Sequence, residues 1–327
     1  MSVNVGVGQT ALVLGERTVP ADDLARELDA RPEVVRRWLG GLTLHVSERS
    51  AAELGADAAR LCLERRGISI EDVPFIVFGS SAPLVPLEEG RRELRVQDLL
   101  GAKHAVVTEV GPACSESITA LRLAHALVAS QPTADRALVV FGERRRTRIL
   151  GYDKETYQPV FSDVGAAVLV ERGAPLGILG FGDATDGRYW DFLAEIRRNG
   201  DVKDEGGPKP PAQTQMDPRR LRLLADSVAT NRLALRRCLA AAGLQAGAIR
   251  HVLLTREGPR IPHAMLRQLD LDAGLLHDPE SGPTHAGMAD FVVSLDRLMS
   301  ERGVAPGAAV LIGSRAVGST RFCLVRG

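Results

Sequence analysis

Aromatic residues, cysteines and net charge are all scarce in this sequence, and each shortage excludes a class of function. Phe, Trp and Tyr make up 4% of the 327 residues, which does not suit an aromatic-rich binding surface. Basic and acidic residues number 41 each, so the formal net charge is zero. Without a global field, the chain should attract neither nucleic acid nor an anionic membrane surface. The composition favours a packed α/β enzyme instead.

The few cysteines are far apart and form no CxxC pair. A chain without paired cysteines is expected to hold no structural zinc, and scattered thiols indicate a reducing compartment. No apolar run approaches the ~18 residues of a membrane-spanning helix, and the N-terminal residues do not resemble a signal peptide. We therefore expect a cytoplasmic protein without a metal site. The cysteines are Cys62, Cys114, Cys238 and Cys323.

Apolar stretches of strand length alternate with amphipathic stretches of helical length along the whole chain. Such alternation predicts an α/β fold, with a mostly parallel sheet system covered by helices. The rhythm repeats, so we expect two halves, residues 1–172 and 173–327. The expected strands are 3–14, 73–79, 105–110, 136–142, 165–171, 176–182, 249–255, 308–312 and 321–325, and the expected helices are 22–28, 49–66, 115–128, 217–242, 262–269 and 286–302.

Cys114 lies at a sharp change of pattern in the chain. Residues 105–110 are typical of a buried strand, 111–113 form a turn, and 115–128 have apolar residues at helical spacing. A thiol at a helix N-terminus has a lowered pKa, because the helix dipole and the free N–H groups favour the thiolate. A nucleophile in this setting indicates acyl-group chemistry. By position alone, a buried and unreactive cysteine fits equally well.

Four short motifs occur in an order and at spacings that resemble the ketoacyl-acyl-carrier-protein synthase III family. They are Ala113-Cys114, 161–169 (FSDVGAAVL), 215–217 (QMD) and 282–284 (GPT). The resemblance implies a thiolase-like fold of two pseudo-equivalent layered α-β-α-β-α halves, the first carrying the nucleophile and the second the base. It also implies a homodimer, no bound cofactor, and an acyl-CoA or a phosphopantetheinyl carrier protein as the acyl donor.

Two residues that condensing members of this family use are replaced here. In the family, a histidine and an asparagine polarise the malonyl thioester during decarboxylation. Thr255 stands at the histidine position and Pro283 at the asparagine position. Threonine is no base at neutral pH, and proline has no side-chain donor. The replacements therefore argue against ordinary decarboxylative condensation.

His285 offers another base close to the vacated asparagine position, and Asp290 follows five residues later. In a Cys-His-Asp arrangement, the carboxylate fixes the imidazole tautomer while the other ring nitrogen faces the nucleophile. We therefore predict a catalytic triad of Cys114, His285 and Asp290. This pattern resembles a divergent acyltransferase branch of the family in antibiotic pathways such as that of cervimycin. Without the resemblance, a surface histidine and a solvated aspartate would be the simpler interpretation.

An oxyanion hole should accompany the triad, because acyl transfer passes through a tetrahedral oxyanion. The N–H of Cys114 is one expected donor. By resemblance, the second donor comes from the loop 313–318, where Ala316 matches the family's oxyanion position within a run of glycines. The neighbours Arg315 and Val317 leave the identity of this donor open, and a plain strand turn fits the loop equally well.

Substrate contacts are weaker predictions. Trp38 lies near the family's adenine-stacking tryptophan, although Val34 aligns there as easily. Arg148 closes a basic run that would meet CoA phosphates or an acidic carrier protein, but such runs are more often solvated. Thr255 and Arg256, at and beside the vacated histidine position, would orient a polar substrate.

Three functions stay open at this point. The leading one is an acyltransferase that moves an acyl group, through an acyl-cysteine, to a small-molecule hydroxyl, amine or carrier acceptor in secondary metabolism. The second is a starter-unit ketosynthase that makes a carbon–carbon bond with malonyl carrier protein. The third is a non-catalytic partner subunit of a second synthase, against which the presence of Cys114 argues.

Overall fold

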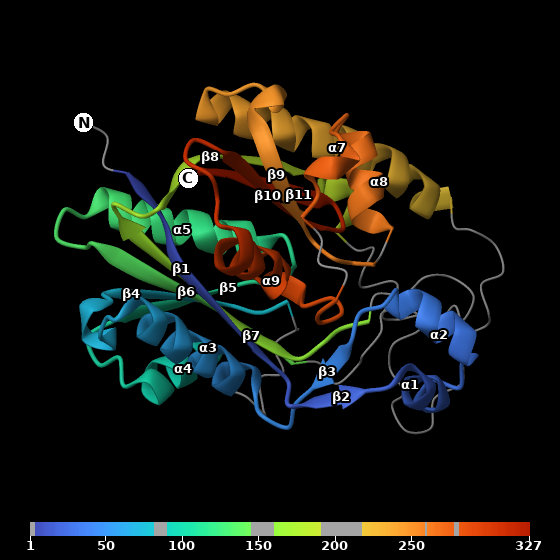
Figure 1. Ribbon diagram of the computed structural model, residues 1–327, viewed down its shortest axis with the longest axis horizontal. Helices are drawn as coiled ribbons and strands as arrows, with labels where there is room; N and C mark the ends of the chain where they lie inside the picture. The colour runs from blue at the N-terminus through green and yellow to red at the C-terminus, as the bar shows by residue number, and fades with distance from the viewer. Residues whose placement is uncertain (1–3, 82–89, 145–159, 191–217, 259, 278–280) are drawn as a thin grey trace.

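The computed structural model describes residues 4–81, 90–144, 160–190, 218–258, 260–277 and 281–327. A nine-stranded sheet in this part of the chain has the order β5-β4-β6-β7-β1-β8-β11-β10-β9 (Figure 1). A separate pair joins β2 (Arg17–Val19) to β3 (Leu44–Val46). The strands of the large sheet are β1 (Val5–Leu14), β4 (Phe75–Gly79), β5 (Val106–Val110), β6 (Arg136–Glu143), β7 (Val164–Arg172), β8 (Leu176–Thr185), β9 (Ile249–Leu254), β10 (Ala309–Ala316) and β11 (Ser319–Arg326).

The large sheet consists of two similar runs of strands. In the first run, β4 pairs in parallel with β5 and β6, and β7 lies antiparallel between β6 and β1. In the second run, β9 pairs in parallel with β10, and β11 lies antiparallel between β10 and β8. The predicted α/β fold with two pseudo-equivalent halves is confirmed. The prediction of a mostly parallel sheet is wrong, because five of the eight described pairings in the large sheet are antiparallel; in each half, one strand (β7 or β11) reverses direction relative to both of its neighbours. The division into domains 1–172 and 173–327 stays a prediction, because one sheet order runs through both, with β1 paired to β8.

Helices form three layers around these two runs of strands (Figure 1). The helices α3 and α4 cover the outer face of the first run, and α7 and α8 cover the outer face of the second. Between the runs lie α5 and α9, whose apolar residues share one buried cluster with strands of both halves. This middle layer therefore holds the halves together. The α-helices are α1 (Ala21–Glu27), α2 (Pro32–Leu39), α3 (Ala51–Arg66), α4 (Arg92–Leu100), α5 (Glu116–Ser130), α7 (Pro218–Ala242), α8 (Ile261–Gln268) and α9 (Asp290–Arg297).

Two helices, α2 and α4, were not predicted from the sequence. The helix α2 has Pro32 in its first turn and ends at Gly40 in the left-handed conformation, so both ends carry recognisable signals. With α1 and the β2–β3 pair, it packs around a small apolar cluster of its own. The helix α4 has a charged first turn, and its Arg92 and Glu93 are buried against expectation. Hydrophobic periodicity alone misses a helix whose buried face is polar.

The strand expected at 105–110 was predicted to be buried, and this is wrong. It forms β5, at the edge of the sheet, where the side chain of Val106 is 65% exposed. A short apolar run does not distinguish a strand in the interior of a fold from a strand at the edge of a sheet.

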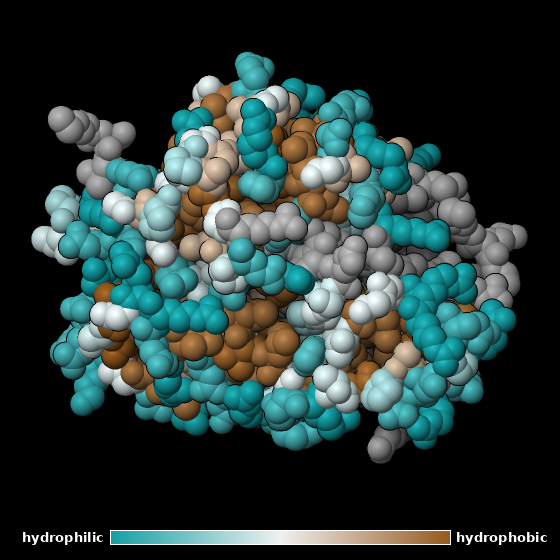
Figure 2. Space-filling view, in the orientation of Figure 1, coloured by the Kyte–Doolittle hydropathy of each residue, from teal (hydrophilic) through white to brown (hydrophobic). Residues whose placement is uncertain are grey.

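The surface in Figure 2 carries hydrophilic side chains around most of its rim and hydrophobic ones near its middle, over β7 and β1. Leu12 and Leu14 of β1 are partly buried and pack against the central cluster. Among the described residues, we find no helix of the length and apolar character that would cross a membrane.

Gly165 allows α3 to lie directly on β7, and its replacement tests this packing. A Cβ atom at Gly165 would lie 1.9 Å from the carbonyl oxygen of Leu54, a backbone atom that cannot move alone. We expect Gly165→Ala to lower the free energy of unfolding by at least about 2 kcal/mol in urea titrations. Gly247→Ala is the control, because its Cβ would meet open space. Equal midpoints for both variants would contradict the packing described here.

Candidate active site

Cys114 lies in the turn that connects β5 to α5, two residues before the helix begins. Its side chain is partly exposed and its thiol is free. Its carbonyl oxygen accepts a hydrogen bond from the Ser117 N–H at 3.2 Å, so the cysteine belongs to the first turn of the helix. This is the strand-turn-helix setting predicted from the sequence, at the N-terminal end of the helix dipole.

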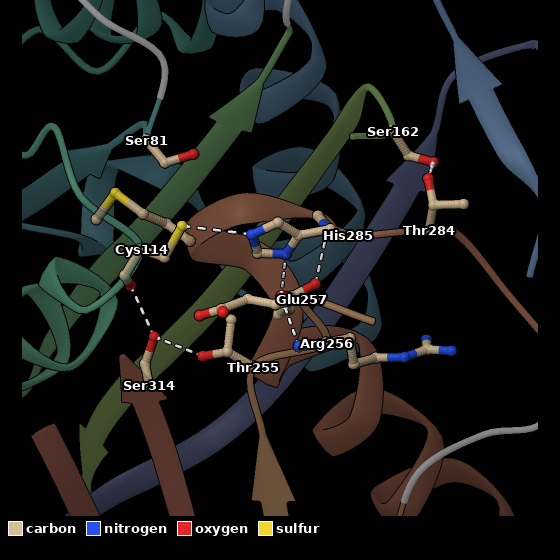
Figure 3. Close-up of polar contacts among 12 residues, drawn as sticks. Ser81, Cys114, Ser162, Thr255, Arg256, Glu257, Thr284, His285 and Ser314 are labelled. Atoms are coloured by element: carbon tan, nitrogen blue, oxygen red, sulfur yellow. Dashed lines mark hydrogen bonds and ion pairs between the residues drawn. The ribbon is translucent and has the colours of Figure 1, made fainter. Parts of the chain in front are cut away.

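His285 lies beside Cys114 (Figure 3), and Asp290 is the first residue of α9. The distance from Cys114 Sγ to His285 Nε2 is 3.5 Å, and His285 Nδ1 forms a hydrogen bond with Asp290 Oδ2. The imidazole therefore connects the thiol to the carboxylate. Both side chains of this pair are only 2% exposed, which argues against a surface histidine and a solvated aspartate.

The segment expected as one helix at 286–302 is divided, and the division brings the pair together. A 3₁₀ turn at Gly287–Ala289 precedes α9, and a π-helical turn at Leu298–Arg302 follows it. The 3₁₀ turn reverses the chain, so that Asp290 Oδ1 accepts the N–H of Ala286 at 2.6 Å. The N–H of Arg256 donates to Asp290 Oδ2 at 2.9 Å. Three donors thus satisfy the buried carboxylate.

Two opposing effects act on the pKa of His285. Burial alone would lower this pKa, because it disfavours the charged imidazolium. The negative charges of Asp290 and the Cys114 thiolate, with their hydrogen bonds, outweigh burial and raise the pKa of His285 well above its ordinary value. The raised pKa makes Nε2 of His285 a stronger acceptor for the proton of a nucleophile beside it.

Residues before β7 hold the imidazole from the other side. The Ser162 N–H donates to the His285 carbonyl oxygen at 3.0 Å, and the rings of Phe161 and His285 lie 4.4 Å apart, centre to centre. Ser162 Oγ is 2.7 Å from Thr284 Oγ1 (Figure 3). The ring of His285 is thereby fixed in position and in orientation.

Thr255 and Pro283 align with the catalytic histidine and asparagine of the family that the sequence resembles. Neither offers a free hydrogen-bond donor to a substrate at Cys114. Thr255 is buried, and its Oγ1 lies 2.9 Å from Ser314 Oγ. Pro283 lies in a bridge to Thr43, where the Thr43 N–H donates to the Gly282 carbonyl oxygen at 2.8 Å.

The remaining predicted residues are more widely distributed. Ala316 ends β10 opposite Ser319, and its role in an oxyanion hole stays a prediction. Arg256 donates its backbone N–H to Asp290, whereas its side chain points away from Cys114 (Figure 3). Trp38 is 4% exposed within the cluster around α1 and α2, and a buried ring offers no face to an adenine. Arg148 lies outside the described residues.

Sequence reasoning missed a buried carboxylate next to the site. Glu143, at the end of β6, accepts hydrogen bonds from the Ser81 N–H (2.7 Å), from Ser81 Oγ (2.7 Å) and from the Met288 N–H (3.0 Å). It therefore joins the turn between His285 and Asp290 to the end of β4. No periodicity marks this residue, which the sequence shows only as the start of a charged run. Within the described residues, no group of His, Cys, Asp and Glu has the arrangement of a metal site.

Comparisons with known proteins show similarity in sequence. Residues 108–187 match the family model of 3-oxoacyl-[acyl-carrier-protein (ACP)] synthase III. The beta-ketoacyl-[acyl-carrier-protein] synthase III of Sphingopyxis alaskensis is 29% identical over 56% of this chain and 58% of its own length. That of Rhizorhabdus wittichii is 26% identical over 98% of this chain and 97% of its own length. For the first relatives the match thus spans about half to three fifths of their length.

Solved structures show the same fold. The acyltransferase ChlB3 has a TM-score of 0.78 at 20% identity, covering 99% of this chain and 97% of that chain. The synthase III (FabH) of Pseudomonas aeruginosa has a TM-score of 0.77 at 21% identity, covering 99% and 98%. The fold is thus thiolase-like. In sequence, the chain is similar to the ketoacyl-acyl-carrier-protein synthase III family.

The charge of Asp290 should control the pH at which Cys114 reacts. Asp290→Asn removes the negative charge that raises the pKa of His285, so the imidazolium is lost at lower pH and the thiol must ionise alone. We expect the pH of half-maximal iodoacetamide alkylation to rise, because no imidazolium then stabilises the negative charge on the sulfur. Asp98→Asn, at an exposed aspartate, is the control. The same alkylation profile in all three proteins would refute the coupling.

Proposed function

We propose that this protein is an acyltransferase. It takes an acyl group from an acyl-CoA or acyl-carrier-protein thioester onto Cys114, and passes it to a hydroxyl, amine or carrier acceptor in secondary metabolism. The observation that supports this is the single imidazole of His285, 3.5 Å from the sulfur of Cys114 and bonded to Asp290. One base in this position serves both halves of an acyl transfer.

The first half acylates the cysteine. His285 Nε2 accepts the thiol proton, and the Cys114 thiolate attacks the carbonyl carbon of the donor thioester. The new S–C bond forms as the carrier thiolate leaves, and the imidazolium returns the proton to that leaving group. Asp290 keeps the proton on Nδ1 throughout, which leaves Nε2 free to act as the base.

The second half transfers the acyl group. With the donor's carrier gone, His285 Nε2 accepts the proton of the acceptor's O–H or N–H group as this group attacks the acyl carbon. The bond to sulfur breaks, and the Cys114 thiolate pairs again with the imidazolium. The backbone N–H groups of Cys114 and Ala316 are the proposed donors to the oxyanion in both halves.

A starter-unit ketosynthase is the second candidate, because the relatives with curated names are synthases. Carbon–carbon bond formation needs donors that hold the malonyl thioester as carbon dioxide leaves. Thr255 is already bonded to Ser314, and Pro283 has no side-chain donor. These observations favour transfer over condensation. The third candidate, a silent partner subunit, does not require the paired Cys114 and His285.

We propose further that the protein is a homodimer and works in the cytoplasm. Among the described residues, β5 is an edge strand with the exposed side chain of Val106, and a second β5 strand would pair with it and cover this side chain. Sedimentation velocity at micromolar concentration would show a monomer if the dimer proposal is wrong. A reducing compartment suits the four free cysteines, since the nucleophile among them must stay a thiol.

Intact-protein mass spectrometry tests the acyl-cysteine. After incubation with a panel of acyl-CoA and acyl-carrier-protein donors, the wild type should gain the mass of one acyl group, and Cys114→Ala should gain none. Subsequent addition of hydroxyl or amine acceptors should discharge the adduct without release of carbon dioxide. No adduct with any donor would favour the silent subunit, and carbon dioxide released with malonyl carrier protein would favour the ketosynthase.

Removal of the imidazole should slow both halves of the reaction. We expect His285→Ala to reduce the rate of transfer about 100-fold or more, the contribution of a general base. His263→Ala is the matched control, because this histidine is exposed on α8. Single-turnover measurements of adduct formation and discharge give the two rates. A rate for His285→Ala near that of the wild type would overturn the assignment of the base.

A further inference from the structure

A chain of hydroxyl groups connects the end of β9 to the backbone of the nucleophile. Thr255 Oγ1 lies 2.9 Å from Ser314 Oγ, and Ser314 Oγ lies 2.8 Å from the carbonyl oxygen of Cys114 (Figure 3). The Arg315 N–H approaches Thr255 Oγ1 at 3.3 Å. Thr255 and Ser314 are both buried, so water does not compete for these bonds.

The direction of this chain is set at both ends. A backbone N–H only donates, and a carbonyl oxygen only accepts. Ser314 must therefore give its proton to Cys114, and Thr255 must give its proton to Ser314. Neither hydroxyl has a proton left for a substrate. Thr255, predicted from the sequence as a substrate contact, thus belongs to the protein's own hydrogen-bond network.

Arg315 fixes the loop that carries Thr255, the first hydroxyl in this row of hydrogen bonds. Its guanidinium forms two hydrogen bonds with the carboxylate of Glu257, at 3.1 and 2.6 Å. Glu257 follows Thr255 by two residues, so the loop after β9 is joined to β10 through the side chain and the backbone of Arg315. The charge of Glu257 also raises the pKa of Arg315, so the guanidinium stays positively charged.

We propose that Ser314, oriented by Thr255, is a positioning residue for the nucleophile, an inference that rests on the proposed function of Cys114. The Cys114 carbonyl accepts one bond from within its own helix, the 3.2 Å bond from Ser117, and one from another strand, the bond from Ser314. With both bonds, the peptide group after Cys114 cannot rotate. The sulfur therefore stays against His285 Nε2.

The test compares three variants of the two hydroxyl residues. Ser314→Ala and Thr255→Val should form the acyl-cysteine about tenfold more slowly, the effect of one buried hydrogen bond, with an unchanged half-saturating donor concentration. Thr255→Ser keeps the hydroxyl and should restore the rate. The pH of half-maximal iodoacetamide alkylation should rise in the first two variants, because the sulfur is no longer held against the imidazole, and return in the third.

Thr320→Val is the control, because it removes a buried hydroxyl bond of 2.6 Å to Asn231 on α7. It should lower stability and leave both the acylation rate and the alkylation profile unchanged. The proposal is overturned if folded Ser314→Ala and Thr255→Val acylate as fast as the wild type, or if Thr320→Val slows acylation equally. If Ser314→Ala does not fold, the comparison of Thr255→Val with Thr255→Ser decides.

Alkylation needs no acyl donor, so it separates this inference from the proposed function. An alkylation shift in a protein that accepts no acyl donor would refute the acyltransferase and support the positioning role. Acyl transfer by the wild type, with the same alkylation profile in the variants as in the wild type, would support the acyltransferase and refute the positioning role.

Discussion

The buried carboxylate of Asp290 is the constraint on which the rest of the site depends. A carboxylate in the interior is costly unless several donors surround it. Here the donors are His285 Nδ1, the N–H of Ala286 and the N–H of Arg256, which come from the turn before α9 and from the loop after β9. To satisfy one charge, the protein must bring these two segments together and hold the imidazole in one tautomer. The geometry around the sulfur follows from this requirement.

The hydrophobic core also fixes how the two halves of the site lie relative to each other. Cys114 comes from the first half, whereas His285, Asp290, Thr255 and Ser314 come from the second. The helices that carry the nucleophile and the carboxylate, α5 and α9, lie in one apolar layer between the two runs of strands and begin at the site. A close-packed layer resists deformation. The packing of α5 against α9 therefore sets the distance of 3.5 Å between the sulfur of Cys114 and the imidazole of His285.

Local signals in the sequence predicted much of this arrangement, whereas long-range pairings were not predictable. The change from strand to helix at Cys114 is a local pattern, and the five-residue interval from His285 to Asp290 fits within one turn and the start of a helix. By contrast, Ser314 meets Cys114 across 200 residues of chain. No periodicity records such a contact, nor does it show that Trp38 is buried or that Val106 lies at an edge. Those features depend on which surfaces the fold brings together.

The vacated positions also limit the kind of acceptor in the proposed reaction. In condensation, the attacking carbanion forms as carbon dioxide leaves, so the enzyme must hold the thioester oxygen of the malonyl group and needs no base for the acceptor. Here the donors at that place are absent or committed, since the Thr255 proton lies on the path to Ser314. One strong base remains, His285, kept basic by Asp290. A site that has a base but no hydrogen-bond donors for an enolate oxygen suits an acceptor with an O–H or N–H group. The proposed class of acceptor, an alcohol or an amine, therefore follows from two features of the site. The hydroxyl protons of Thr255 and Ser314 are already used in hydrogen bonds, and His285 can accept a proton.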